Sequence, residues 1–598
     1  MRASNVAALL FWALVHGLGA KEADNGALPI AGSGPPREGT GPTRISADFK
    51  PIVENSPGAT FNKDVAPIIF QHCATCHRPG QAGPFNLLNY GDVKKRAKQI
   101  AEAVEKRYMP TWLPERGLVK FANDRSLASA QIEIIQRWVA EGAIEGAAAD
   151  LPKLPDWTEG WQLGGPDVVV TPPQPYMLPG EGKDVYHNLI IPIPVSGRKY
   201  VKGIEFQPGN AKVLHHAFVM VDSTRVSRVR ATKQTPPGFD GMWLPETVAM
   251  PDGHFLGWQP GRAPQFGPAG LAWILKTNTD LVLQLHLHPS GKPEQVQPRV
   301  GFYFTEERPT NSAFRINLNA LRIDIPAGSK DYAVEDRYTL PVEVALLGVG
   351  PHAHYLGKSV HGYAVMTDGT SKELILIKDW DFNWQGEFRY AEPIVLPKGA
   401  TLVMNWTYDN STNNIRNPNH PPKRVRHGPE TTDEMGELWF QVLPRNPKER
   451  GLFEQDFYGH LAQLAIDYNE WLVQENPSNA EAHTKAGRAE LYFGQTEKAV
   501  EHFRTAVRAD PNYDKAYYEL GFILLRQNKL PEAQEAFEKV TRLNPEDSEA
   551  EGSLGIIYLR KNDVNQAEAH FQAALRINPD DELARKYLQR IREARERR

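Results

Sequence analysis

The sequence predicts a multidomain protein with a small all-α domain, an all-β middle region and a C-terminal α-solenoid. Three observations support this order: helical periodicity at 93–105 and 129–139, alternating apolar and polar residues from about 155 to 445, and a repeat with a 34-residue period near the end. At ~150 residues per domain, 598 residues allow about four domains. A composition of 41% hydrophobic residues excludes wholesale disorder, and a net charge of −4 excludes a general nucleic-acid binder.

The first twenty residues have the layout of a secretory signal peptide. Arg2 gives a positive start, Val6 to Val15 is an apolar run, and small residues follow up to Ala20. The run is too short to span a bilayer, which needs ~20 apolar residues. We therefore expect a signal peptide at 1–20, a Gly/Pro/Ser-rich linker at 21–57, a periplasmic or secreted location and no membrane span in the mature chain. An uncleaved N-terminal anchor is the alternative.

Both cysteines of the chain lie in one short motif, C-x-x-C-H, formed by Cys73, Cys76 and His77. In this motif two thiols bind the vinyl groups of a haem c and the imidazole binds its iron. A redox dithiol or half of a zinc site is the alternative. Met109 is the only methionine between His77 and residue 150, which makes it the candidate sixth iron ligand unless it is a core residue. The region 58–146 resembles a small class I cytochrome c.

Four columns of residues recur every 34 positions near the C-terminus. They are Pro477, Pro511, Pro545 and Pro579; Gly487, Gly521 and Gly555; Ala499, Ala533 and Ala567; and Phe503, Phe537 and Phe571. The period resembles the tetratricopeptide repeat, whose helix pairs stack into a solenoid with a concave groove. We expect a repeat domain at 453–598, with a leading helix at 453–475 and three repeats at about 478–579. Such arrays bind protein partners; packing against its own chain is the alternative.

Three histidine-containing stretches of the β-rich region lie in apolar, strand-like sequence. They are VLHHAFVMV with His215 and His216, LVLQLHLHP with His286 and His288, and LLGVGPHAHYLG with His352 and His354. Residues two apart in a strand share a face, ~7 Å apart, so each spaced pair can bind one ion. The adjacent pair can do so only at a bulge or a strand end. Met435 follows in a polar turn, and a thioether beside imidazoles favours copper, although most methionines are packing residues.

The order of these motifs, HH, LQ-x-H, H-x-H-x-LGK and a DEM turn, resembles the ascorbate-dependent type II copper monooxygenases, the family of peptidylglycine α-hydroxylating and dopamine β-monooxygenases. The resemblance implies two jelly-roll β-sandwich subdomains, at 155–300 and 301–445, with one copper ion on each. It implies an electron-transfer copper on His215, His216 and His286. It also implies a second, catalytic copper that reacts with O2. The ligands of this second copper would be His352, His354 and Met435.

His288 has no counterpart in those ligand sets. We expect it to orient the ligands of the first copper, and an alternate ligand or an ordinary strand histidine are the other possibilities. The chain also departs from the peptidylglycine enzymes in three places. It has Gly350 where they carry an arginine for the substrate carboxylate, and Glu437 and Trp439 where they carry asparagine and tyrosine. The resemblance therefore extends to the copper ligands and not to peptidylglycine recognition.

The expected function is hydroxylation of a C–H bond in an unknown organic substrate with O2. Electrons would come from an external donor, ascorbate or a cytochrome, by way of the fused haem domain. The competing hypothesis is a non-catalytic periplasmic electron-transfer or copper-binding protein docked through its repeats. A zinc hydrolase is disfavoured because the sequence has no H-E-x-x-H motif.

Overall fold

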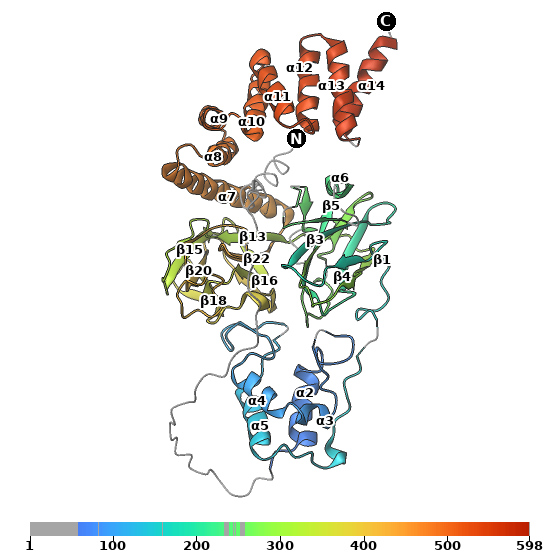
Figure 1. The fold of residues 1–598 in the computed structure, drawn as a ribbon, viewed down its shortest axis with the longest axis vertical. Coiled ribbons are helices and arrows are strands. Elements are labelled where there is room, and N and C mark those ends of the chain that lie inside the picture. Colours follow the sequence, from blue (N-terminus) through green and yellow to red (C-terminus); the bar gives the residue numbers. More distant parts are fainter. Residues whose placement is uncertain are drawn as a thin grey trace.

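The computed structural model describes residues 58–596 with gaps at 82, 123, 158–159, 233–237, 243, 246, 252–256, 269 and 580. The expected signal peptide and linker at 1–57 lie outside the described residues. A helical region, two β-sandwiches side by side and a row of helices follow one another along the long axis of the molecule (Figure 1). None of the described helices combines the length and apolarity needed to cross a bilayer.

The N-terminal region is all-helical over its regular elements. These are η1 (Phe61–Val65), α2 (Ala66–His72), α3 (Tyr90–Lys94), α4 (Ala97–Glu105), α5 (Ser129–Ala140) and η2 (Ala148–Asp150). The helical periodicity predicted at 93–105 and 129–139 is confirmed, although the first segment is divided between α3 and α4; α4 and α5 bury Ile100 and Trp138 in one core with Phe61 and Ile69. The cysteine motif begins directly after α2, so this core fixes the start of the motif.

The first sandwich consists of two antiparallel sheets. One has the order β1 (Val168–Val170), β12 (Arg299–Thr305), β4 (Lys199–Gln207), β9 (Trp273–Leu275); the other has β6 (Gly238–Asp240), β3 (Val185–Pro192), β10 (Asp280–Leu287), β5 (Leu214–Asp222), β7 (Val248–Ala249), with β8 (Gly257–Trp258) also on β5. A β2 (Tyr176–Leu178) and β11 (Glu294–Val296) pair and α6 (Val226–Thr232) complete this unit. The leucines of β10 pack against Phe302 and Trp273 of the other sheet. The predicted division near residue 300 falls within β12, which pairs with β1 and β4 of this sandwich.

The second sandwich has two four-stranded antiparallel sheets. Their orders are β13 (Phe314–Asn319), β22 (Gly436–Pro444), β16 (Val344–Ala353), β19 (Phe388–Leu396), and β15 (Tyr332–Thr339), β20 (Thr401–Tyr408), β17 (Gly357–Val365), β18 (Ser371–Ile377). A short pair, β14 (Asp324–Ile325) and β21 (Val425–Arg426), lies beside them, and η4 (Phe382–Trp384) lies in the β18–β19 connection. Alternate residues of both sheets, such as Leu438 and Trp406, meet in one core.

Backbone hydrogen bonds join the helical region to the second sandwich. Phe121 forms a bridge with Tyr390, Ala122 donates to the Arg389 carbonyl at 2.8 Å, and Ala391 donates to the Lys120 carbonyl at 2.9 Å. The Phe121 ring is buried in the core of the second sandwich. Residues 120–122 therefore pair with β19 in the manner of an added edge strand, and they fix the helical region against the second sandwich.

Eight helices complete the chain. They are α7 (Pro447–Glu475), α8 (Ala480–Tyr492), α9 (Thr496–Ala509), α10 (Asp514–Arg526), α11 (Leu530–Leu543), α12 (Ser548–Arg560), α13 (Val564–Ile577) and α14 (Glu582–Glu596). The predicted 34-residue columns have a packing reason: a Cβ on Gly487 or Gly555 would lie 2.6 or 2.7 Å from Phe503 or Phe571, the aromatic residue of the same repeat. Each repeat therefore packs its phenylalanine directly against the backbone of its first helix.

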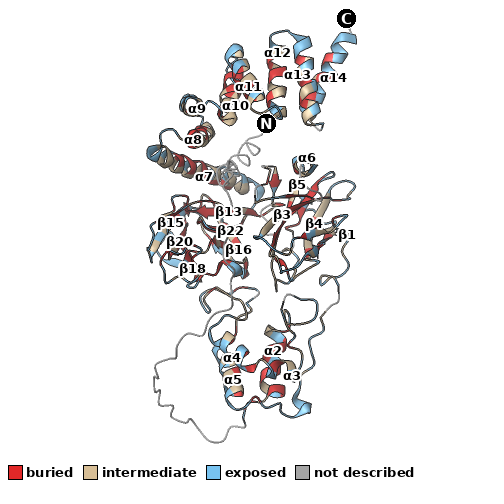
Figure 2. Cartoon of the chain, viewed as in Figure 1, coloured by how far each residue is buried: buried red, intermediate tan, exposed pale blue. Residues whose placement is uncertain are grey.

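The leading helix, α7, begins at Pro447 rather than at residue 453, because Asn446 caps its N-terminus and proline is favoured at the first helical position. Phe453 and Phe457 of α7 are buried in the core of the second sandwich, where both pack edge-on against Tyr338. Buried residues run through both sandwiches and along the facing sides of the repeat helices (Figure 2). The repeats are thus connected to the β-structure by a shared core.

Candidate metal centres

A β-bulge brings the first group of histidines together. Strands β5 and β10 pair His216 with His286 and then Leu214 with Leu287, so His215 is the extra residue of the bulge. The bulge turns both adjacent histidines toward His286, which the sequence allowed only at such an irregularity. The face of β10 that carries His286 is opposite to the leucine face, as its alternation predicts.

Three ring nitrogens converge in this first cluster. The Nδ1 atom of His215 lies 3.1 Å from Nδ1 of His216 and 3.2 Å from Nδ1 of His286. The outer nitrogens are engaged elsewhere: Nε2 of His215 donates to the Asn383 carbonyl at 2.9 Å, and Nε2 of His286 lies 3.2 Å from the Asp184 carboxylate. The Nδ1 lone pairs of His215 and His286 therefore face each other. Ligands about 2.0 Å from one tetrahedral ion lie about 3.3 Å apart, so this donor set fits a metal ion.

Asp184 and His288 form the outer part of the first cluster. Asp184 bonds His288 Nδ1 at 2.7 Å through one oxygen and His286 through the other. Within the described residues, His215, His286 and His288 form the group of three whose ligand atoms all lie within 4.8 Å of one another. The sequence analysis missed Asp184. Its position becomes evident only from the pairing of Val185 with Leu287, which places Asp184 across from His288.

The electrostatics of the first cluster favour neutral imidazoles. Burial, with the neighbouring His286 and His288, lowers the pKa of His215 to about 4, and burial lowers the pKa of His216 well below its ordinary value. Burial raises the pKa of Asp184, but the hydrogen bonds from His286 and His288 outweigh it and hold this pKa below its usual range. The lowered pKa values of His215 and His216 favour the neutral form of these two rings, which metal binding requires.

The second group lies where β16 ends and β22 begins. His352 and His354 have perpendicular rings with centroids 5.3 Å apart. Nδ1 of His352 donates to Gln385 Oε1 at 2.6 Å, and Nδ1 of His354 donates to the Asp433 carbonyl at 3.1 Å, which leaves both Nε2 atoms as the available ligands. Ala353 pairs with Gly436, so the flanking residues His354 and Met435 are neighbours across the two strands. The predicted polar turn before β22 is therefore the element that carries Met435.

A buried carboxylate fixes the backbone of this second cluster. Glu434 is fully buried, and its side chain accepts hydrogen bonds from the backbone N–H groups of His354, of Leu356 at 2.9 Å and of Met435 at 2.8 Å. Burial raises the pKa of Glu434 to about 8 although these hydrogen bonds act in the opposite direction. The sequence placed Glu434 in the turn and gave it no role. Its three partners lie in the turn between β16 and β17 and directly before β22, segments that are distant in the sequence.

The cysteine motif lies at a large cavity between the helical region and both sandwiches. The cavity measures about 1540 Å³, and Cys73, Cys76, His77 and Met109 all line it. Nδ1 of His77 donates to the Phe85 carbonyl at 3.1 Å, and the ring stacks on Phe85 with centroids 4.6 Å apart. This leaves Nε2 of His77 as the available ligand, which fits a haem iron.

Burial makes both thiols of the motif weaker acids than a free cysteine thiol. Burial raises the pKa of Cys73 to about 12, with a further contribution from Cys76, and burial also raises the pKa of Cys76. A reactive dithiol needs a lowered thiol pKa, so the redox alternative is disfavoured. Cys76 also lies against the first sandwich, because a Cβ on Gly261 would be 2.8 Å from its sulfur.

Comparison with known protein families gives matches in the repeat region. A model described as tetratricopeptide repeat matches residues 518–582, and a second model, TPR repeat, matches residues 487–528. The comparison with curated proteins finds no match. The matched residues fall within α8 to α14, in the register of the predicted 34-residue columns. The C-terminal helices of this chain are therefore tetratricopeptide repeats.

Proposed function

We propose that the chain is a copper-dependent monooxygenase that uses O2 to hydroxylate a C–H bond of an organic substrate. The observation that carries the proposal is the placement of two histidine clusters, one on each sandwich, from motifs in the order of the type II copper monooxygenases. On this proposal the sandwiches are the jelly-roll subdomains of that family. Gly350 and Glu437 replace the residues used for peptidylglycine, so the substrate belongs to another class.

The residues of both clusters fit copper. His215, His216 and His286 would hold one ion through Nδ1 atoms, while His352 and His354 would hold the other through Nε2 atoms together with the Met435 thioether. A thioether ligand favours Cu(I) over zinc, calcium or magnesium. When bound, copper supplies one-electron chemistry and O2 activation. The chain orients the rings through Asp184, Gln385 and the Asp433 carbonyl.

A haem c on Cys73, Cys76 and His77, with Met109 as sixth ligand, would supply one-electron transfer beside the first cluster. The support is the position of the motif. Cys76 lies against Gly261, and the neighbouring residues Gln259 and Pro260 line a cavity of about 200 Å³ together with His215 and His216. On this proposal the helical region receives electrons from an external donor, ascorbate or a cytochrome, on the side of the first cluster.

A non-catalytic electron-transfer or copper-binding protein is the second candidate. The observation that favours it is the tetratricopeptide array, since such arrays bind partners and rarely carry chemistry. On this alternative the chain binds copper and haem, but it consumes no more O2 than the electrons stored on its own metal ions can reduce.

Metal analysis and electron paramagnetic resonance of the full mature chain test the proposal. We expect two copper ions and one covalent haem per chain, and substrate-dependent O2 consumption once a reductant is present. Copper binding without catalytic O2 consumption for any candidate substrate would favour the second candidate. Zinc in place of copper at both clusters would contradict the two hypotheses together.

A variant of the haem region tests the direction of electron supply. The change His77→Ala removes an iron ligand that lies outside both histidine clusters. We expect slower turnover with a cytochrome donor and unchanged turnover with a chemical reductant that reaches the copper ions directly. Met109→Leu should act in the same direction with a smaller effect. An equal rate for wild type and His77→Ala with both donors would show that the haem region does not supply the clusters.

A further inference from the structure

One short segment of the second sandwich contacts both histidine clusters. Residues 379–385 connect β18 with β19 and include the η4 turn. The Asn383 carbonyl accepts the Nε2 proton of His215 at 2.9 Å, and Gln385 Oε1 accepts the Nδ1 proton of His352 at 2.6 Å. The first and second clusters are therefore linked through two hydrogen bonds and the backbone between Asn383 and Gln385. We call residues 379–385 the bridging segment.

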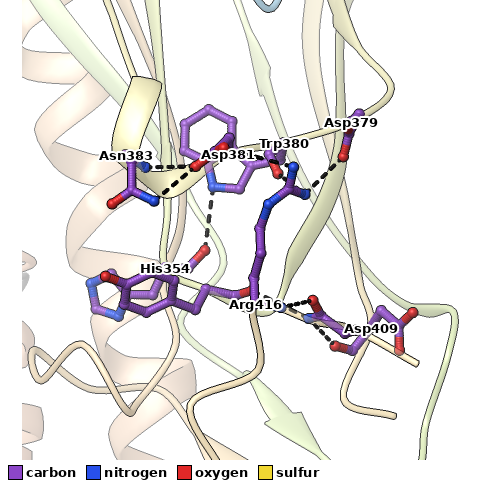
Figure 3. Close-up of polar contacts among 9 residues, drawn as sticks. His354, Asp379, Trp380, Asp381, Asn383, Asp409 and Arg416 are labelled. Carbon is purple, nitrogen blue, oxygen red and sulfur yellow. Dashed lines mark hydrogen bonds and ion pairs between the residues drawn. The ribbon is translucent and has the colours of Figure 1, made fainter. Parts of the chain in front are cut away.

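The bridging segment is anchored at its start by an arginine. Arg416 donates to the Asp379 carboxylate at 2.8 Å and to the Trp380 carbonyl at 3.0 Å, and it lies 3.7 Å from the Asp381 carboxylate (Figure 3). Asp381 in turn accepts from the backbone N–H of Asn383 at 3.0 Å and from its side chain at 3.1 Å. This network fixes the turn that presents the Asn383 carbonyl.

The bridging segment also contacts His354 of the second cluster through Trp380 and Phe382. Trp380 Nε1 donates to the His354 carbonyl at 3.3 Å, as Figure 3 shows, and Trp380 is fully buried. The Phe382 ring packs edge-on against the His354 imidazole with centroids 5.7 Å apart. His352 and His354 thus both depend on the bridging segment for their orientation.

On its other side the bridging segment covers the first cluster. Asn383, Trp384 and Gln385 line the cavity of about 200 Å³, as do His215, His216 and His288. A movement of the segment would therefore change the surroundings of both clusters together.

We propose that the bridging segment is a positioning element that couples metal binding at the two clusters. This rests on the proposed function, in that both clusters bind copper. The Asn383 carbonyl holds the proton of His215 on Nε2 and so presents Nδ1 to an ion. The Gln385 side chain holds the proton of His352 on Nδ1 and so presents Nε2. An ion that orders one ring orders the shared segment, and so favours the binding geometry of the other ring. Such coupling is reciprocal.

The test uses Gln385→Leu in the full chain, with copper as the only added ligand. Competitive Cu(I) titrations and the Cu(II) resonance spectrum report on each cluster. We expect a tenfold to hundredfold loss of affinity at the second cluster, on the order found for other outer-sphere partners. The decisive result is a change of about fivefold or more in copper affinity at the first cluster. Gln385 bonds His352 of the second cluster, so such a change has to pass through the bridging segment. Gln385→Glu keeps the acceptor and should restore both affinities.

A second variant acts from the far end of the segment. Arg416→Gln removes the anchor without touching either cluster, and it should shift the first-cluster affinity in the same direction. Arg424→Gln is the matched control, because the ion-pair partner of Arg424 on the same sandwich is Asp324, which lies outside the bridging segment. Unchanged first-cluster affinity and spectrum in both Gln385→Leu and Arg416→Gln would overturn the coupling. A wild-type chain that binds no copper would instead contradict the proposed function.

Discussion

The first cluster is held by hydrogen bonds to the outer nitrogens of its rings, whereas the second cluster has, besides such ring bonds, a buried carboxyl group that bonds the backbone around its ligands. Asp184 and the Asn383 carbonyl each bond an outer ring nitrogen of the first cluster, where the Nδ1 atoms already lie 3.1 to 3.2 Å apart. Glu434 instead bonds backbone N–H groups on either side of the second cluster. The comparison teaches that the two sites should fail in different ways. Loss of a ring partner should weaken metal binding at either site, whereas loss of the Glu434 hydrogen bonds should also destabilise the fold around the second site.

Glu434→Ala should have the largest effect. It leaves three buried N–H groups without an acceptor, which should lower the free energy of unfolding by about 3 kcal/mol or more. Copper at the second cluster should be lost while the first cluster keeps its ion. Denaturant unfolding and copper stoichiometry measure the two effects. Glu434→Gln retains one acceptor oxygen and should fall between the wild type and the alanine variant; equal stability of all three proteins would refute the backbone role.

Met435→Leu separates the thioether from the packing of the second cluster. Leucine conserves most of the volume, so stability should change by less than about 1.5 kcal/mol. Cu(I) affinity at the second cluster should fall by about a hundredfold. This is the upper end of the loss of affinity seen when a residue that hydrogen-bonds a metal ligand is replaced, and here a ligand itself is removed. Met404→Leu is the control, since Met404 is buried in the core of the same sandwich. The same Cu(I) affinity in both variants would show that Met435 is a packing residue.

Asp184→Asn tests the side-chain support of the first cluster. The carboxylate orients His286 and His288, and its loss should lower copper affinity at this cluster by about tenfold to a hundredfold, with a smaller loss at the second cluster through the coupling proposed above. Asp240→Asn is the matched control, because Asp240 bonds His187 of the same sandwich, outside both clusters, at 2.6 Å. The comparison between clusters breaks down if the two variants give the same copper affinity.

His288→Gln should have the smallest effect. The His288 side chain is 39% exposed and bonds Asp184. If it only orients the ligands, its replacement should lower copper affinity by less than about tenfold. His216→Gln should abolish binding at the same cluster. The reverse ranking of these two variants would make His288 the third ligand, in line with the compact grouping of His215, His286 and His288.

The sequence predicts those features that depend on local spacing. The alternation of β10 and the 34-residue columns appear in the structure as predicted, and the rings of His352 and His354 lie with centroids 5.3 Å apart although β16 ends between the two residues. Asp184, Glu434 and Gln385 carry no such signal. Asp184 meets His288 across 104 positions of sequence, and Glu434 meets the His354 N–H across 80, through strand pairing that a single sequence does not specify. The bulge at His215 could be predicted only in part. If two adjacent histidines bind one ion, the strand must be irregular there, but the sequence does not show whether a bulge or a strand end brings the two rings together.

The long helix α7 sets the geometry between the repeats and the β-structure. Its 29 residues extend over about 43 Å at 1.5 Å per residue, and its first half is embedded in the second sandwich through Phe453 and Phe457. A partner protein bound by the solenoid would therefore be held at a fixed distance and in a fixed orientation relative to the histidine clusters. Lengthening α7 by a single residue would rotate the whole solenoid by about 100° about the helix axis.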